Sequence, residues 1–363
     1  MSLIWCSISG HGFGHAAQVV AVLNELGRLI SSLKVILRTA VPSWYFQDQL
    51  QVPWDISACE QDIGCLQQGP LHIDVGGTWE AHDRFHRNWM DRVTEEAAAI
   101  KRHSPHVVIS DVAYLAIEAG ARANIPVVGL SSICWDQVLI HLHDKMPPES
   151  TPVIQQIQHS YSLADLMIRI TPGIPMPVFR RTIDVSPIAA QTEPDRQGIR
   201  HVLGAGTEER IVMIAFGGIP LTSLPWNRLD TMTGYRFIVP GPVPPQIQRV
   251  VSSETLPFPF QTMMASCDIL ITKPGYATII EAVASGTRVI YVRRYNFVDE
   301  TSLVGYLHRY GRGLELSIED FLNGRWEQTM EAIMAIPASQ TSVPPATGAA
   351  EAADILKRYV GMG

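Results

Sequence analysis

Residues 267–292 read CDILITKPGYATIIEAVASGTRVIYV. The stretch begins with an apolar run, turns at Lys273 and Gly275, continues with a helical pattern that opens near Tyr276, and ends with a second apolar run. Short apolar runs without alternation are typical of strands buried on both faces, and helices join such strands in parallel sheets. This stretch therefore predicts an α/β domain built on a parallel sheet.

The same pattern recurs along the chain in two series. Five apolar runs separated by helical patterns occupy 1–170, a proline-rich stretch without clear period follows at 171–194, and a second series then begins. We expect two Rossmann-like, doubly wound parallel-sheet domains that face each other across a cleft. The expected boundaries are 1–180 for the first domain, 181–194 for a linker, 195–345 for the second domain, and 346–363 for a C-terminal helix that packs back on the first domain.

Length and composition fit two cytosolic domains. A chain of 363 residues with 46% apolar residues can fill two cores, and a net charge of 28 − 35 = −7 argues against nucleic acid as the main partner. The five cysteines are odd in number and form no C-x-x-C pair, which indicates reduced thiols. The sequence shows neither a signal-peptide pattern nor an apolar run of about 20 residues that could cross a bilayer.

The stretch GHGFGHAAQ at 10–18 follows the first apolar run, and a helical pattern begins at Ala16. Glycines at a strand-to-helix turn let the backbone approach a ligand, and the helix start offers free N–H groups to an anion. We expect Gly12 and Gly14 to contact phosphate or the acceptor, although a plain tight turn would use the same glycines. The stretch lacks G-x-G-x-x-G, since His15 takes the third glycine position, and it lacks the G-K-[ST] of a P-loop.

His11 and His15 flank these glycines. Imidazole at a helix N-terminus suits a general base or a phosphate contact at neutral pH, so both histidines are candidate catalytic residues. A purely structural histidine is the alternative for each. No third ligand stands at a metal-binding spacing, so we expect no metal.

The stretch at 267–292 carries the second candidate site. Thr278 and Glu281 lie three residues apart on one helical face, where a carboxylate could accept hydrogen bonds from the two hydroxyls of a ribose. Lys273 offers a point charge to phosphate, and Gly275 precedes the helix. The structural alternatives are a capping interaction between Thr278 and Glu281 and a solvated Lys273.

Two other segments of the second half are candidates for donor binding. Gly217 and Gly218 follow an apolar run and form either a backbone nest suited to phosphate or a plain turn. Met263 lies in the loop 256–268, whose backbone could frame a planar base. Packing in a core is the alternative for this methionine.

Together, GHGFGHAAQ, the run Ile109-Ser110-Asp111 and the stretch at 267–292 resemble GT-B glycosyltransferases that use nucleotide-sugar donors. The likeness is greatest to the lipid-linked GlcNAc transferase of peptidoglycan synthesis. The first stretch is also similar to the glycosyltransferase-like N-terminal region of arabinokinases. The resemblance implies the GT-B fold, with the acceptor on the first domain and the donor on the second. It also implies that His15 is the base or phosphate contact. Asp111 is the third candidate catalytic residue, since the matching region in some members orients the histidine or lines the acceptor cleft. A packing role is the alternative for Asp111.

The resemblance also bears on the donor site. Loops at the position of Gly217, Gly218 and Thr222 touch the diphosphate in the family, and a glutamate at the position of Glu281 contacts the ribose. Many members carry an acidic residue followed by Gln or Asn where this chain has Asp299-Glu300, so the donor sugar stays open. The full set of candidate donor-binding residues is Gly217, Gly218, Thr222, Met263, Lys273, Gly275, Thr278, Glu281, Asp299 and Glu300.

We therefore expect a metal-independent glycosyltransferase that moves a hexosyl or N-acetylhexosaminyl group from a nucleoside-diphosphate donor, UDP-linked, to an acceptor hydroxyl. The alternatives are a sugar-nucleotide epimerase or hydrolase on the same fold and a non-catalytic module that binds sugar nucleotides. The donor is a substrate, and no cofactor is expected. The acceptor is either a small molecule or lipid-linked. We expect a cytoplasmic protein, with or without contact to the inner face of the membrane.

Overall fold

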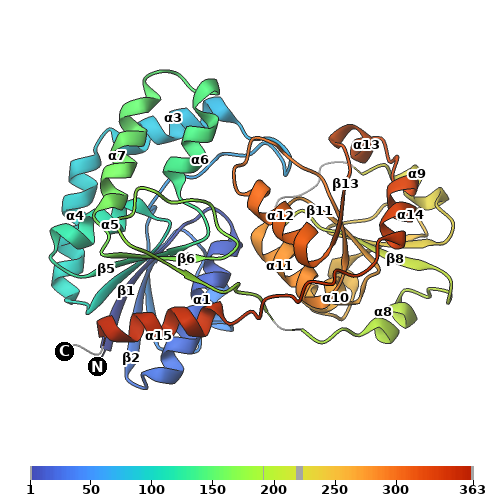
Figure 1. Cartoon of the computed structure of the whole chain (residues 1–363), viewed down its shortest axis with the longest axis horizontal. Helices are drawn as coiled ribbons and strands as arrows, with labels where there is room; N and C mark the ends of the chain where they lie inside the picture. The colour runs from blue at the N-terminus through green and yellow to red at the C-terminus, as the bar shows by residue number, and fades with distance from the viewer. Residues whose placement is uncertain (1, 191, 218–223, 361–363) are drawn as a thin grey trace.

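The computed structural model of the chain describes residues 2–190, 192–217 and 224–360. It contains two α/β domains that lie side by side (Figure 1). All strand pairs within both sheets are parallel. The two doubly wound parallel-sheet domains expected from the alternating apolar runs are therefore confirmed.

The first domain is built on a sheet with the strand order β3-β2-β1-β4-β5-β6-β7. Alternate residues of a strand point to opposite faces, so Ile4 and Cys6 pack against the first helix whereas Trp5 packs on the other side of the sheet. The strands are β1 (Ser2–Ile8), β2 (Leu33–Thr39), β3 (Trp54–Ala58), β4 (Val107–Asp111), β5 (Val127–Ser131), β6 (Leu166–Ile170) and β7 (Thr182–Val185).

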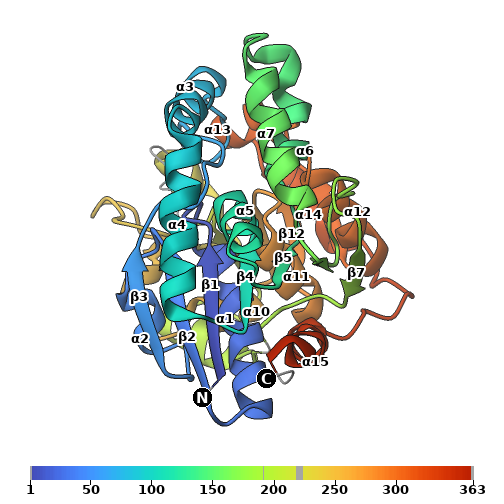
Figure 2. The same cartoon turned by 90° about the vertical axis from the view of Figure 1, so that its left-hand side faces the viewer.

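Helices cover both faces of this sheet. One face carries α1 (Phe13–Leu29), α2 (Trp44–Gln47) and α15 (Gly348–Val360). The other face carries α3 (Val75–His86), α4 (Trp89–His103), α5 (Tyr114–Arg122), α6 (Trp135–Leu142), the short 3-10 helix His143–Lys145 and α7 (Ser150–Ser162). Seen from its outer side, this domain has α3, α6 and α7 at one end, while the start of β1 and the end of α15 lie near each other at the opposite end (Figure 2).

The second domain is built on a sheet with the order β10-β9-β8-β11-β12-β13. The strands are β8 (Arg210–Ile214), β9 (Tyr235–Val239), β10 (Val250–Ser252), β11 (Ile269–Thr272), β12 (Arg288–Tyr291) and β13 (Arg312–Glu315). One face packs against α9 (Trp226–Thr231), α13 (Ile318–Leu322) and α14 (Glu327–Ala335). The other packs against α8 (Arg196–Val202), α10 (Phe260–Ser266), α11 (Tyr276–Ser285) and α12 (Glu300–Tyr310), and a 3-10 helix spans Ser253–Thr255.

The sheets are wider than the apolar runs predict. The expected linker at 181–194 contains β7, which pairs with β6 and extends the first sheet beyond residue 180. The strands β3 and β10 were also not expected. All three lie at sheet edges, where one side of the strand has no partner and polar residues are tolerated.

Two helix boundaries differ from the sequence patterns. The amphipathic pattern of residues 79–102 predicts a single helix, but the structure has two helices there, α3 and α4, that are separated at Arg87 and Asn88. Helix α1 begins at Phe13 rather than at Ala16, because Gly12 adopts φ 90° as its N-cap and so turns the chain directly into the helix. His15 therefore lies in the first turn of α1, not in a loop.

The two domains exchange apolar side chains at their junction. Leu71, from the connection between β3 and α3, is 7% exposed and packs in the core of the second domain. In return, Phe297 from the connection between β12 and α12 is 6% exposed and packs in the core of the first domain. Tyr276 adds a polar contact, since its hydroxyl donates to the Thr171 carbonyl at 2.7 Å and accepts from the Ile188 N–H at 3.2 Å.

Helix α15 returns the chain to the first domain and lies along α1 (Figure 1). Ala352, Ala353 and Leu356 are fully buried in the same core as α1. The start of the helix is tightly held, because a Cβ on Gly348 would come within 1.9 Å of the Ser186 carbonyl oxygen. This end of the chain is thus part of the core of the first domain.

Shortening Leu356 tests this packing. Leu356→Ala should lower the free energy of unfolding of the first domain by about 2–5 kcal/mol, because it removes a fully buried side chain and leaves a cavity. The measurement is urea unfolding followed by circular dichroism. Lys357→Ala is the control, since Lys357 is exposed and should change stability by no more than about 0.5 kcal/mol. Equal midpoints for the two variants would contradict the packing.

Candidate active site

His15 and Asp111 form a buried hydrogen-bonded pair at the junction. The Nδ1 atom of His15 lies 3.0 Å from Oδ1 of Asp111, which stands at the end of β4. Burial disfavours a charge on His15, but the Asp111 carboxylate outweighs it and raises the pKa of His15, with smaller contributions from Asp62 and Asp299. The second Asp111 oxygen, Oδ2, is buried and has no hydrogen-bond partner among the described residues.

The backbone next to Asp111 is strained. Val112 has φ 52°, a left-handed conformation that a β-branched residue rarely adopts. Tyr161 holds it by donating its hydroxyl hydrogen to the Val112 carbonyl at 2.6 Å, and the Ala113 N–H donates to the Asp111 carbonyl at 2.6 Å. Strain of this kind persists only where surrounding contacts enforce it, and it fixes the direction of the Asp111 side chain.

Asp62 is a second buried carboxylate near His15, and sequence analysis did not single it out. Its Oδ2 accepts a hydrogen bond from the Trp135 indole N–H at 2.6 Å. Burial raises the pKa of Asp62 to about 6, while hydrogen bonds from Trp135 and Ser9 partly oppose this. The Trp135 ring in turn lies 5.1 Å from the His11 ring and 6.3 Å from the His15 ring, measured between ring centroids.

His11 has the opposite electrostatic environment. Burial lowers the pKa of His11 to about 3, and the nearby charges of His15, Lys273 and Arg294 act in the same direction. Its Nε2 lies 3.4 Å from Nε2 of Gln67, and its own backbone N–H donates to Ser9 Oγ at 3.2 Å. His11 is therefore neutral at physiological pH, so it can accept or donate one hydrogen bond but does not supply charge.

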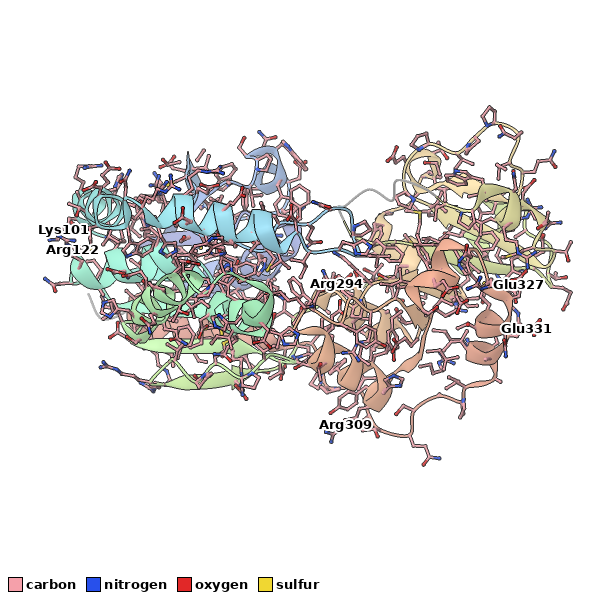
Figure 3. The ribbon with its side chains drawn as sticks, turned by 90° about the horizontal axis from the view of Figure 1, so that it is seen from above. Lys101, Arg122, Arg294, Arg309, Glu327 and Glu331 are labelled. Atoms are coloured by element: carbon pink, nitrogen blue, oxygen red, sulfur yellow. The ribbon has the colours of Figure 1, made fainter. Side chains whose placement is uncertain are left out.

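The second domain presents Lys273 and Asp299 to these histidines. Burial lowers the pKa of Lys273 to about 8, with Arg294 adding to the effect. Burial raises the pKa of Asp299 to about 7, although Arg294 and Lys273 oppose it. Figure 3 shows Arg294 at the junction between the domains. Oδ1 of Asp299 is buried without a hydrogen-bond partner among the described residues.

Glu300 does not fit its expected role in donor binding. Its side chain is fully buried, and its carboxylate accepts from the Arg294 backbone N–H at 2.9 Å and from Arg294 Nε at 2.5 Å. Both oxygens are thus engaged by the loop that carries them. Glu300 shapes the 293–299 connection, and only Asp299 of this pair has an oxygen left for a ligand.

The start of α11, where sequence analysis expects an anion site, has no side-chain cap among the described residues. Gly275 is its N-cap, so the first N–H groups are available. Thr278 lies in the first turn and is half-buried. Burial raises the pKa of Glu281, whose Oε1 accepts from the Ala190 N–H at 3.3 Å. The alternative role of Glu281, a capping interaction with Thr278, is therefore not what occupies this carboxylate.

The structure places the remaining candidate residues in different surroundings. Gly217 adopts φ 73° and lies close to Lys273, since a Cβ on Gly217 would be 3.9 Å from Lys273 Cε. Gly218 and Thr222 lie outside the described residues. Met263 is only 3% exposed and packs in the core of the second domain, so its side chain is not available to a ligand. On the first domain, a Cβ on Gly12 or Gly14 would meet no atom within 4 Å.

Within the described ranges, no three His, Cys, Asp or Glu side chains are placed to hold a metal ion. No helix in those ranges combines the length and apolar character needed to span a bilayer. The groups that gather at the junction are thus one histidine–carboxylate pair, a neutral histidine, two further carboxylates, a lysine and the start of α11. This set can remove a proton from a hydroxyl and bind an anion close by.

Comparison with known proteins gives one relative by sequence. No family model matches the chain. The chain is 28% identical over 338 residues to an L-arabinokinase of Arabidopsis thaliana, and the alignment covers 91% of this chain. It covers 32% of the arabinokinase, so the chain spans about a third of the length of this curated relative. The similarity to arabinokinases indicated by GHGFGHAAQ is confirmed.

Solved structures match over the whole chain. The calicheamicin glycosyltransferase CalG4 superposes with a TM-score of 0.69 at 14% identity and 99% coverage of both chains. A UDP-glucosyltransferase from Polygonum tinctorium gives 0.62 at 15% identity, covering 99% of this chain and 94% of that one. MurG from Acinetobacter baumannii gives 0.57 at 14% identity, covering 99% and 100%. At these identities the likeness shows the fold, and the GT-B architecture expected from the motifs is confirmed.

The opposite environments of the two histidines can be measured. We expect His15 to titrate above pH 6.5 and His11 to stay neutral down to about pH 3, in carbon–proton NMR spectra assigned with His15→Gln and His11→Gln. Asp111→Asn should lower the pKa of His15, because burial then acts without the neighbouring negative charge. Asp55→Asn, which removes an exposed carboxylate paired with Lys34, is the control. An unchanged His15 titration in Asp111→Asn would refute the assignment.

Proposed function

We propose that the chain transfers a sugar from a nucleoside-diphosphate donor to an acceptor hydroxyl, with His15 as general base. The observation that carries the proposal is the His15–Asp111 pair on one domain, within electrostatic reach of Asp299 on the other, with Lys273 of that domain within electrostatic reach of the neighbouring His11. A base and an anion-binding group on separate domains suit a reaction that joins two substrates. The structural neighbours named as glycosyltransferases support the same activity.

On the acceptor side, Asp111 determines which nitrogen of His15 is basic. Because Nδ1–H of His15 donates to Asp111, the lone pair is on Nε2. Nε2 takes the proton of the acceptor hydroxyl while the hydroxyl oxygen attacks the anomeric carbon of the donor. The bond from this carbon to the phosphate oxygen breaks in the same step. Asp111 stabilises the imidazolium that results, and such a base contributes about 10²–10⁴ in rate.

On the donor side, the diphosphate lies at the start of α11. Lys273, the free N–H groups after Gly275 and the backbone at Gly217 receive the negative charge of the departing diphosphate, so the proposed step uses no metal. Glu281 contacts the ribose of a UDP-linked donor, and Oδ1 of Asp299 accepts from a hydroxyl of the transferred sugar. The five free cysteines support a cytoplasmic location, with membrane contact depending on whether the acceptor is lipid-linked.

Nucleotide binding is the first test. Calorimetric titration with UDP should give binding that Lys273→Met weakens about 10- to 100-fold, as expected for loss of a hydrogen bond from a charged group. Because the pKa of Lys273 is lowered to about 8, affinity for UDP should fall as pH rises through 8 in the wild type but not in the variant.

Lys101→Met is the matched control, since Lys101 is exposed at the far end of the first domain (Figure 3). It should leave UDP affinity unchanged. Absence of heat with UDP, and likewise with dTDP and GDP, would overturn the proposed function.

The second test separates binding from turnover. His15→Ala should lower the rate of sugar transfer about 10²- to 10⁴-fold while UDP affinity stays the same. Transfer is measured as UDP released from UDP-sugars with and without acceptors. Equal rates in the wild type and His15→Ala would exclude His15 as the base. Release that needs no acceptor would instead support the hydrolase alternative.

A further inference from the structure

Three buried oxygen atoms around the histidine pair have no hydrogen-bond partner among the described residues. They are Oε1 of Gln67, Oδ2 of Asp111 and Oδ1 of Asp299. Gln67 contacts His11, Asp111 contacts His15, and the charge of Asp299 reaches His15. The three atoms thus come from three separate segments around the two histidines, and all three are hydrogen-bond acceptors when the carboxylates are ionised.

Such a set indicates what kind of molecule completes it. Buried polar atoms in native proteins are nearly always hydrogen-bonded, so these oxygens require donors. A diphosphate carries only acceptors at neutral pH and cannot supply them. Several hydroxyl groups on one small ring can. The transferred sugar would satisfy Asp299 on the second domain, but Gln67 and Asp111 belong to the first domain, where the acceptor binds.

The segment that carries Gln67 is held firmly against the histidines. Asp62 bonds to the Trp135 indole, and a Cβ on Gly64 would come within 2.5 Å of the His11 ring, so the backbone packs directly on it. The backbone around Gln67 is also bonded to the start of α3, since the Asp74 N–H donates to the Leu66 carbonyl at 2.8 Å. The backbone on both sides of Gln67 is thus held in place, and its side-chain Nε2 lies 3.4 Å from Nε2 of His11.

We infer that the segment 61–67 forms the acceptor subsite, and that the acceptor is a polyhydroxylated molecule, a carbohydrate rather than a planar aromatic compound. Oε1 of Gln67 accepts from one acceptor hydroxyl while Nε2 of His15, the ring nitrogen that points away from Asp111, faces the reacting one. This inference rests on the proposed function and goes beyond it by naming the acceptor class.

An aromatic acceptor would leave these oxygens without donors. Trp135, the aromatic ring beside both histidines, is fully buried and its N–H is taken by Asp62, so it offers no open face. The competing aromatic surface is Phe13, which is 42% exposed in the first turn of α1. The two acceptor classes therefore depend on different residues, and variants at Gln67 and Phe13 distinguish them.

The experiment is saturation-transfer NMR on UDP-saturated protein, with a panel of mono- and disaccharides and a panel of planar phenols. We expect transfer to saccharides, with an affinity that Gln67→Leu lowers about 3- to 10-fold through loss of one hydrogen bond. Gln67→Glu keeps an acceptor oxygen and should retain the affinity. Gln68→Leu, at the exposed neighbouring position, is the control. Unchanged UDP affinity in a variant shows that the variant is folded. If Gln67→Leu does not fold, Gln67→Met is used in its place.

Two results would overturn the inference. One is a UDP-saturated protein that receives no transfer to any saccharide. The other is selective binding of phenols that Phe13→Leu weakens and Gln67→Leu does not. Both leave the proposed function intact, because it depends on UDP binding and on His15. Failure of UDP binding itself would contradict the proposed function instead and is detected before the panels are used.

Discussion

The exchange of Leu71 and Phe297 between the two cores is the constraint on which the site depends. Each side chain is buried in the opposite domain, so neither core is complete without the other. Separating the domains would expose both residues to water, at about 1.5–3 kcal/mol each. This packing holds the start of α1 near Lys273 and Asp299, and only in that arrangement does His15 lie among three carboxylates.

The central strands were predictable from sequence, whereas the edges were not. Apolar runs such as 107–111 and 269–272 are buried on both faces, and burial leaves an unmistakable pattern. The edge strand β3 reads WDISA and has only half-buried and exposed residues, so nothing in its composition separates it from a loop. The strand β7, which sequence analysis placed in a linker, reads TIDV and buries only Val185, so it also lacks a clear strand pattern.

The site residues likewise divide into those that the sequence predicted and those that only the structure reveals. His15, Asp111 and Lys273 stand at strand ends or beside glycine turns, where parallel sheets gather ligand-binding groups. Asp299 is the N-cap of α12 and was singled out through the family resemblance. The structure brings these groups together around the two histidines. Asp62 and Gln67 lie in a long connection with no regular period, so only tertiary contacts reveal their proximity to the histidines. The sequence identified Glu300 as a residue near the site but gave it the wrong role. Its carboxylate bonds to Arg294, which lies in a turn whose shape no local sequence pattern predicts.

The return of α15 to the first domain has a mechanical consequence. The main chain crosses between the domains once after β7 and again before α15, and both crossings pass on the side of α15 (Figure 1). The contacts of Leu71 and Phe297 are formed by other connections. Two tethers on one side restrict the domains to a hinge motion, in which the tethered side stays closed while the opposite edge swings open. Substrate entry and product release would then share that single edge.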